Sequence, residues 1–377
     1  MNLKSIQMLR GLAALLVVYT HSISQIGIFA LGWQQRMPAR ISLGTFGVDL
    51  FFVISGFVIY ISACHLRGRM ASLSFLWHRF RRINPTYYIA VLLTVITWSP
   101  SLIRQQRPPI TGWEALSWTI LLPFPGDPPR AISQAWTLCF EWFFYLLFFL
   151  LILARTKQKA RILCWLLGGL ALLGWLLRNY LSGLLVFYTD PLLLEFLMGV
   201  GIGYAWQRWN PGGRTALCLL WPGLALGLFF ILTGYGDYQA ILAPPASVKY
   251  LHAIFWGSAA ALIVAGCVFL EKSGTSNIFF RHQNFGPDLR PDLVGKPRFA
   301  RLLLLLGDAS YSIYLFHLLI FGWIAAFYLR VGFFLNPDLA ILIDAAIAVA
   351  GSLFFYKIIE VPLLRWLRST PPRSAKP

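Results

Sequence analysis

Residues 43–65, LGTFGVDLFFVISGFVIYISACH, decide the fold, because Asp49 is the only acidic or basic residue before the closing histidine. A helix rises about 1.5 Å per residue, so about 20 apolar residues cross the roughly 30 Å hydrocarbon core of a bilayer. Backbone polar groups in lipid have to be hydrogen-bonded within their own segment, which favours a helix over a strand. The stretch therefore predicts a membrane-spanning helix.

Similar runs recur along the chain on both sides of this stretch. Together with it they predict ten membrane-spanning helices, at about 8–29, 43–65, 83–101, 136–154, 162–178, 190–206, 215–233, 249–270, 302–328 and 338–358. The predicted fold class is all-α, a polytopic integral membrane protein. We expect one membrane domain over residues 1–366 and a disordered cytoplasmic tail over residues 367–377, where two prolines follow one another.

The composition excludes other classes of protein. Of the 377 residues, 58% are hydrophobic and 12% are charged, against about 25% charged residues in a typical soluble domain. A soluble enzyme or a disordered chain would not be this apolar. The net charge of +18 is typical of a nucleic-acid binder. No water-soluble basic domain is visible, however, so we expect no nucleic-acid partner.

The basic residues predict how the chain lies in the membrane. If the N-terminus is cytoplasmic, 24 of the 32 Lys and Arg residues fall in the segments on the cytoplasmic side. Cytoplasmic loops of membrane proteins carry such an excess of Lys and Arg. We therefore expect both termini in the cytoplasm, which agrees with an even number of spans.

Two polar side chains share the first predicted span, in LRGLAALLVVYTHS at residues 9–22. Arg10 and His21 are eleven residues apart, which places them on one helix face about 16 Å apart along the axis. With Arg10 at the cytoplasmic edge, His21 lies near the middle of the bilayer. A neutral imidazole there can take a proton from a hydroxyl group. The alternative is a structural histidine bonded to a neighbouring helix.

A basic cluster, RFRRINP, occupies residues 79–85 at the start of the third predicted span. Arg79 and Arg82 are three residues apart and share a helix face, and guanidinium groups bind phosphate oxygens in bidentate fashion. The alternative is ordinary anchoring of basic residues on the cytoplasmic side. Pro85 is expected to break or begin the helix at this point.

Two of the acidic residues inside predicted spans are candidate site residues, Asp49 in GVDLFFVISGF and Glu141 in AWTLCFEWFFY. A charge at bilayer depth costs about 2.5 to 3.5 kcal/mol on insertion scales, so each acid is a candidate site. The alternative for both is an ion pair with Arg or His on another helix. The cysteines and histidines show no metal-ligand spacing, and no metal site is expected.

The stretch GDASYSIYLFH, residues 307–317, adds further polar side chains in the ninth predicted span. Ser310, Tyr314 and His317 share a helix face, and Tyr311 lies one step round from them. A second histidine at membrane depth favours a polar channel between helices. These four residues are the candidate lining of a substrate channel.

These stretches, in order, resemble the motifs of the acyltransferase 3 family of membrane-bound acyltransferases, which modify bacterial surface polysaccharides. IQMLRGLAALLVVYTHS resembles the Arg-x10-His signature, met by Arg10 and His21, FGVDLFFVISGFVI resembles the second-span motif, and RFRRINPTYY resembles the Arg-x-x-Arg element. AWTLCFEWFFY resembles Trp-Ser-Leu-x-x-Glu-x-x-x-Tyr, with Thr137 where serine is usual. GDASYSIYLFH and the Glu-x-Pro of Glu360 and Pro362 resemble the last two motifs. The resemblance covers about residues 5–366.

The resemblance implies a membrane-bound O-acyltransferase at the bacterial inner membrane. Such a protein takes an acyl group, commonly acetyl, from cytoplasmic acyl-coenzyme A and passes it to a hydroxyl of a polysaccharide or of a lipid-linked oligosaccharide. The thioester is a donor substrate, so no tightly bound cofactor is expected, and membrane lipids surround the chain. Many members carry a C-terminal hydrolase-like domain, and this chain is expected to be the stand-alone form without one.

The resemblance and the residue patterns together assign roles. The expected ligands of acyl-coenzyme A are Arg10, Arg79 and Arg82. His21 is expected to act as general base or brief acyl carrier, oriented by Glu141 or another buried acid such as Asp49. The expected channel lining is Ser310, Tyr311, Tyr314 and His317.

A proton-coupled permease or flippase of a glycolipid or small solute is the alternative function. It explains buried ionisable groups equally well. It does not explain the arginine pair, and it predicts an internal symmetry that the sequence lacks.

Overall fold

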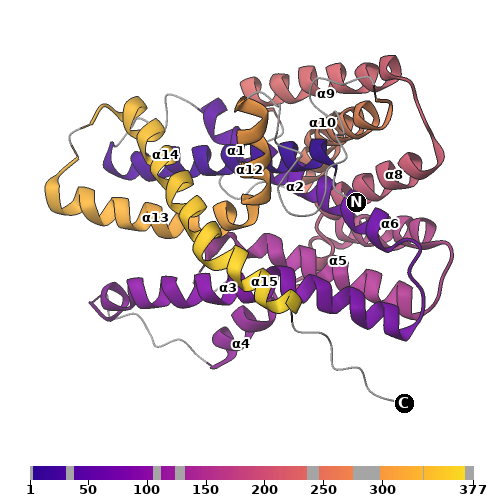
Figure 1. The fold of residues 1–377 in the computed structure, drawn as a ribbon, viewed down its shortest axis with the longest axis horizontal. Coiled ribbons are helices and arrows are strands. Elements are labelled where there is room, and N and C mark those ends of the chain that lie inside the picture. Colours follow the sequence, from indigo (N-terminus) through magenta and orange to yellow (C-terminus); the bar gives the residue numbers. More distant parts are fainter. Residues whose placement is uncertain are drawn as a thin grey trace.

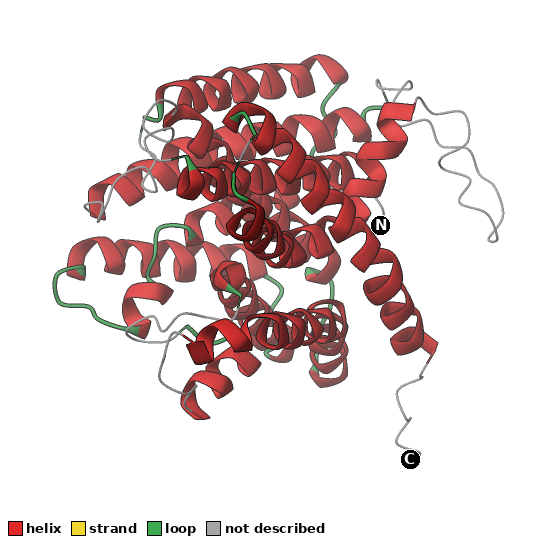
Figure 2. Cartoon of the chain, turned by 90° about the vertical axis from the view of Figure 1, so that its left-hand side faces the viewer, coloured by secondary structure: helices red, strands yellow, loops and turns green. Residues whose placement is uncertain are grey.

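The computed structural model describes residues 3–30, 38–104, 112–123, 132–235, 246–274, 298–333 and 335–369. Within these residues every regular element is helical (Figures 1 and 2). Two elements, η2 and η5, are a 3₁₀ turn and a π-helical turn. The elements are α1 (Lys4–Phe29), α2 (Pro38–Ala63), α3 (Arg69–Arg104), α4 (Gly112–Ile120), η2 (Ser133–Ala135), α5 (Trp136–Leu153), α6 (Lys159–Leu177), α7 (Leu184–Tyr188), α8 (Leu193–Arg208), α9 (Gly213–Thr233), α10 (Ala246–Lys272), α12 (Arg298–Asp308), α13 (Ser310–Val331), α14 (Pro337–Phe355), η5 (Tyr356–Glu360) and α15 (Val361–Ser369).

Nine helical segments in the described part of the chain are long and apolar enough to cross a membrane. Their outer surface is apolar, since Trp165 on α6 and Trp221 on α9 are 79% and 65% exposed. An apolar surface of this extent is stable against lipid rather than against water. The chain is therefore an all-α, multi-pass membrane protein. The nine segments are Lys4–Phe29, Leu43–Ala63, Ser133–Leu153, Lys159–Leu177, Leu184–Arg208, Gly213–Thr233, Ser247–Lys272, Ser310–Val331 and Pro337–Leu367.

The remaining predicted span, residues 83–101, is the second half of α3, a 36-residue helix that is not among these nine segments. The helix continues through position 85 without interruption, so the prediction that Pro85 breaks or begins a helix is wrong. A proline removes one backbone hydrogen bond. The packing of α3 against α5, α13 and α15 keeps the helix continuous despite that loss.

The ninth predicted span, residues 302–328, is two helices rather than one. α12 and α13 meet at Ala309, and in Figure 1 α12 runs across the direction of α13. Among the described helices of this region, α13 is the one that can span a membrane, so the predicted start at residue 302 is wrong. The leucines at 302–306 supplied the apolar signal, but they belong to α12, which packs against α1.

The last predicted span, residues 338–358, extends further than expected. α14 continues through the π-helical turn η5 into α15, which ends at Ser369. The first three residues of the predicted disordered tail are therefore helical, and residues 370–377 lie outside the described residues.

α2 is the central helix of the bundle. It packs against α1 and α8, and also contacts α5, α9 and α10. Aromatic side chains fill the core where these helices meet. The ring of Phe196 lies 4.8 Å from that of Phe52 and 4.8 Å from that of Phe144, measured between ring centres. The helix α1, which packs against α2, also packs against α12, α13 and α14. It therefore connects α2 with the helices near the C-terminal end of the chain.

The crossing of α2 and α8 requires glycine on both helices. A Cβ at Gly199 would lie 2.1 Å from the carbonyl oxygen of Val53, and a Cβ at Gly56 would lie 2.2 Å from that of Phe196. We expect Gly199→Ala to push the helices apart and to lower the melting temperature of the detergent-purified protein by several degrees, since overpacking costs about 1–3 kcal/mol. Gly201→Ala is the control, because no atom lies within 4 Å of a Cβ there. Equal melting temperatures of the two variants would contradict this account of the crossing.

Candidate active site

Six helices enclose a cavity of about 130 Å³. Its apolar lining comes mainly from α2, in which Phe51 and Phe52 are the largest residues. Seven of the predicted site residues line it, and three further polar residues were not predicted. The predicted ones are Arg10, Arg79, Arg82, Glu141, Ser310, Tyr311 and Tyr314, and the others are Ser55, Thr137 and Tyr145.

The three arginines supply positive charge to one part of the cavity. Arg79 is held by Ser62, whose Oγ accepts a hydrogen bond of 2.6 Å from Nη2. Its guanidinium carbon also lies 5.3 Å from the ring centre of Phe75. Arg10 is close enough to Arg82 for the two charges to interact. Three guanidinium groups so near one another favour an anionic ligand between them.

Arg81 lies between the two cavity arginines in sequence but points elsewhere. Its Nη1 donates a hydrogen bond of 2.7 Å to the carbonyl oxygen of Leu367 on α15. Its guanidinium carbon lies 5.6 Å from the ring centre of Trp77. Arg79 and Arg82 therefore share the cavity, as their spacing of three residues predicts, whereas Arg81 is turned away from them.

Glu141 is fixed by two hydroxyl groups. Its Oε1 accepts hydrogen bonds of 2.6 Å from Tyr145 and 3.2 Å from Ser55 Oγ. The carboxylate also interacts electrostatically with Arg10. Tyr145 is four residues beyond Glu141 on α5, a spacing that places both on one helix face and could have identified it. Ser55 is on α2, so no sequence spacing links it to Glu141.

Three hydroxyl groups of α13 also line the cavity. Tyr311 donates a hydrogen bond of 2.8 Å to the carbonyl oxygen of Ile83. The hydroxyl of Tyr314 lies 2.8 Å from Oγ1 of Thr137 and donates at 3.1 Å to the carbonyl oxygen of Gln134. Ser310 is fully buried, and its Oγ has no hydrogen-bond partner among the described residues. That hydroxyl remains available to a ligand in the cavity.

His21 and His317 lie beyond Tyr314. The centre of the His317 ring is 6.2 Å from that of Tyr314 and 5.0 Å from that of His21. Neither histidine lines the cavity itself. Arg10, Arg79, Arg82, Glu141 and Tyr314 line it, and the rings of His317 and His21 continue this series of polar side chains beyond Tyr314. We call the whole series the polar channel.

The backbone sets the tautomer of both imidazoles. Nδ1 of His21 lies 2.9 Å from the carbonyl oxygen of Val17, and Nδ1 of His317 lies 2.9 Å from that of Ile313. A carbonyl oxygen only accepts, so each Nδ1 carries the hydrogen and each Nε2 is the basic nitrogen of a neutral ring. The group that orients His21 is therefore a backbone carbonyl, where the sequence predicted Glu141 or another buried acid.

A glycine allows α12 to pack closely against α1, the helix that carries His21. A Cβ at Gly307 would lie 1.9 Å from the carbonyl oxygen of Gln7, so only glycine lets α12 approach α1 this closely. Gly307 is the first residue of the stretch that ends in His317. The close approach explains how that stretch comes to face the helix that carries His21.

Glu360 and Asp49, from two further predicted motifs, do not line the cavity. Glu360 is buried beside α13, where its Oε2 accepts a hydrogen bond of 2.5 Å from Ser312, and it interacts electrostatically with Arg82. Asp49 does not line the cavity. Its Oδ1 lies 3.1 Å from Nε2 of His252 on α10, and Glu195 on α8 is close to both. The structure therefore separates Asp49 from His21 and Glu141.

The fold and the site define a multi-pass membrane protein with a buried cavity suited to an anionic ligand and to acid–base chemistry. The chain matches the acyltransferase 3 family, an acyltransferase domain, over residues 3–357, and it belongs to that family. It is a membrane-bound O-acyltransferase.

Relatives of the chain differ in length. It is 28% identical over 339 residues to the Exopolysaccharide production protein ExoZ of Rhizobium meliloti, covering 88% of this chain and 93% of that protein. It is 24% identical over 340 residues to the Peptidoglycan O-acetyltransferase OatA of Listeria monocytogenes, covering 83% of this chain and 48% of that protein. It is 25% identical over 407 residues to the Acyltransferase MdmB of Streptomyces mycarofaciens, covering 100% of this chain and 95% of that protein. No solved structure matches the chain.

The Thr137 hydroxyl is expected to hold Tyr314 in place. Thr137→Val keeps the shape of the side chain but leaves the buried tyrosine without this partner, so we expect a loss of about 1 kcal/mol in unfolding free energy. Thr137→Ser keeps the hydroxyl and is expected to behave as the wild type. Thermal unfolding of the three purified proteins checks this, and a valine variant as stable as the wild type would show that the hydroxyl group does not matter.

Proposed function

We propose that the protein transfers an acyl group, with acetyl the best fit, from cytoplasmic acyl-coenzyme A to a hydroxyl of a cell-surface or exported polysaccharide or its lipid-linked precursor. The observation that carries this proposal is the polar channel, which joins three arginines to two imidazoles. The names of two relatives, an exopolysaccharide production protein and a peptidoglycan O-acetyltransferase, support a carbohydrate acceptor.

The charge of the cavity supports the donor. Coenzyme A carries phosphate groups, which suit the guanidinium groups of Arg10, Arg79 and Arg82. In the proposed complex the nucleotide lies at the arginines while the thioester points along the cavity. The relatives that are named O-acetyltransferases support acetyl as the acyl group.

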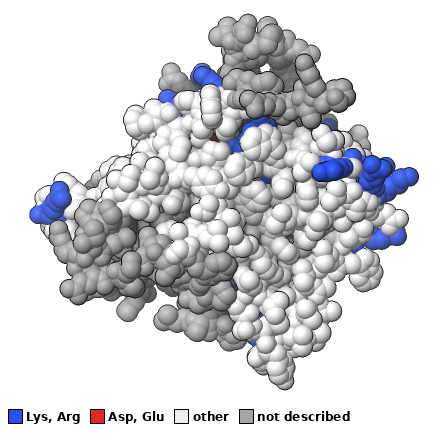
Figure 3. Space-filling model, turned by 90° about the horizontal axis from the view of Figure 1, so that it is seen from below, with Lys and Arg blue, Asp and Glu red and all other residues white. Residues whose placement is uncertain are grey.

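The distribution of basic residues supports an orientation with both termini in the cytoplasm of a bacterial inner membrane. In Figure 3 the largest group of exposed Lys and Arg side chains lies at the right-hand edge of the molecule. Cytoplasmic ends of membrane proteins are enriched in these residues. In this orientation the arginines of the cavity face the compartment that contains acyl-coenzyme A.

Proton transfer in the proposed reaction centres on His21. Its Nε2 takes the proton of the acceptor hydroxyl while the hydroxyl oxygen bonds to the carbonyl carbon of the thioester. The tetrahedral intermediate then collapses, the carbon–sulfur bond breaks and an ester forms. The departing thiolate takes the proton from His21, which restores the neutral imidazole. His317 and Tyr314 line the path between the arginines and His21.

A hydrogen-bond donor in the cavity would position the thioester on its way to His21. The hydroxyl of Ser310 faces the cavity, has no hydrogen-bond partner among the described residues and can donate to the thioester carbonyl. Glu141 positions Tyr145 and balances part of the arginine charge. We assign Glu141 to this positioning role, since its described hydrogen bonds are not to His21.

The test of the acceptor is mass spectrometry of the surface polysaccharide from strains with and without the gene. We expect a base-labile ester on the polymer that is lost with the gene and restored by the wild-type gene. Identical ester content in the two strains would contradict the proposed acceptor. Membership of an acyltransferase family already counts against the permease or flippase alternative.

A further inference from the structure

A second group of buried polar residues lies outside the acyl-transfer cavity. It consists of Asp49 on α2, Glu195 on α8 and His252 on α10, each at most 1% exposed. The three residues offer one carboxylate oxygen or imidazole nitrogen each, and these atoms all lie within 4.8 Å of one another. None of the three residues lines the cavity.

Glu195 has no donor group of the described residues bonded to it. It is completely buried, and no described N–H or O–H group donates to either of its carboxylate oxygens. Asp49 is close enough for a hydrogen bond between the two carboxyl groups when one of them carries a proton, and Asp190 also interacts with Glu195. A buried carboxylate next to another carboxylate is costly unless a positive charge lies between them. The group therefore calls for a bound cation or a shared proton.

The packing around the group fixes its side chains. A Cβ at Gly257 would lie 2.9 Å from Cγ of Glu195, so any larger residue at position 257 would displace the Glu195 side chain. The ring of Trp256 stacks on that of His252 with 5.0 Å between ring centres and 19° between the planes. Ligands held in this way are preorganised for an ion.

We propose that Asp49, Glu195 and His252 form a buried binding site for a divalent transition-metal ion, with zinc the best match to the ligand set. Two carboxylate oxygens and an imidazole nitrogen are typical zinc ligands, whereas magnesium and calcium prefer oxygen ligands alone. A doubly charged cation also neutralises the two carboxylates, whose net charge costs free energy in low-dielectric surroundings. The site is separate from the acyl-transfer chemistry and does not depend on it.

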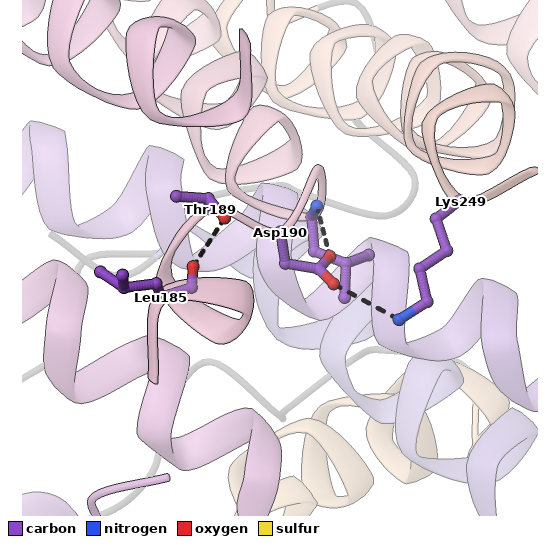
Figure 4. Close-up of polar contacts among 5 residues, drawn as sticks. Leu185, Thr189, Asp190 and Lys249 are labelled. Carbon is purple, nitrogen blue, oxygen red and sulfur yellow. Dashed lines mark hydrogen bonds and ion pairs between the residues drawn. The ribbon is translucent and has the colours of Figure 1, made fainter. Parts of the chain in front are cut away.

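Asp190 connects this site with the edge of the bundle. Its Oδ2 lies 3.5 Å from Nζ of Lys249, as Figure 4 shows, and its Oδ1 accepts a hydrogen bond of 3.1 Å from the amide of Leu192. The Lys249 side chain is 27% exposed, whereas that of Asp190 is 9% exposed. A carboxylate in this position is close enough to Glu195 to interact with it and adds negative charge near the group, part of which Lys249 offsets.

The test is the zinc content of the full-length protein, purified in detergent, equilibrated with zinc chloride and then freed of unbound ion. We expect about one zinc ion per chain in the wild type and at least a tenfold lower content in Glu195→Gln and His252→Ala. Asp344→Asn is the control, because Asp344 is an equally buried acid that accepts a hydrogen bond of 2.8 Å from Tyr328 elsewhere in the bundle. This control is expected to keep its zinc.

Thermal unfolding provides a second readout on the same samples. Added zinc is expected to raise the melting temperature of the wild type and of Asp344→Asn but not that of Glu195→Gln. A cooperative unfolding transition of Glu195→Gln without zinc shows that this variant is folded. A wild type that binds no zinc and shows no shift would overturn the proposal and leave a shared proton, detectable as a protonated-carboxyl infrared band that Glu195→Gln removes. Equal zinc content in Glu195→Gln and the wild type would overturn it as well.

Discussion

Replacement of His21 with alanine is expected to reduce acyl transfer at least about 100-fold at matched protein levels, because a positioned general base contributes roughly 10² to 10⁴ in rate. The imidazole sits at the end of the polar channel, and its Nδ1–H is committed to the Val17 carbonyl. Its Nε2 is therefore the basic nitrogen available to an acceptor hydroxyl. The measurement is ester formation on the carbohydrate acceptor in membranes from strains that carry each variant.

His78→Ala is the matched control for this experiment. His78 is exposed on α3, lies near Ser74 and does not line the cavity. We expect that variant to retain wild-type activity. Normal acyl transfer by His21→Ala would refute the role of general base and would leave His21 as a structural histidine that holds α1 against α13.

The second large effect is expected at the arginines. In the double variant Arg79→Gln/Arg82→Gln, we expect the KM for acyl-coenzyme A to rise at least about tenfold, since one hydrogen bond to a charged group contributes about 1.5–3 kcal/mol. The kcat should change less, because these residues hold the donor away from the reacting carbonyl. Initial rates at several donor concentrations separate the two constants.

Arg81→Gln is the control within the same motif. It removes one positive charge from the same helix, against two in the double variant, but Arg81 donates to Leu367 and does not line the cavity. We expect a KM close to that of the wild type. If Arg81→Gln raised KM as much as the double variant, the effect would come from the net charge of the membrane face and not from a donor site.

Much of the fold could be predicted from the sequence, because a membrane-spanning helix is determined by the length and hydropathy of its own segment. Two predictions were wrong, one at residues 302–306 and one at Pro85. The leucines at 302–306 are as apolar as a span, yet they form α12 and pack against α1. The helix through Pro85 continues because neighbouring helices support it. In both places the tertiary packing, which no single segment encodes, decides the outcome.

The candidate site could be predicted in part for the same reason. Helical spacing correctly placed Arg79 and Arg82 on one face, and it set Arg10 and His21 on α1 at the two ends of the polar channel. Spacing within a helix does not show which other helix a side chain meets. The sequence offered a histidine on another helix as a partner for Asp49, but it could not identify His252, which lies 203 positions later in the chain.

We propose that the protein transfers an acyl group from coenzyme A to a hydroxyl of a carbohydrate. Acyl transfer is tested most directly by incubation of radiolabelled acetyl-coenzyme A with inverted membrane vesicles and the surface polysaccharide or its lipid-linked precursor. We predict base-labile label on the carbohydrate with wild-type and Arg81→Gln vesicles, and little label with His21→Ala vesicles. The claim would be contradicted if wild-type vesicles incorporated no more label than vesicles from a strain that lacks the gene.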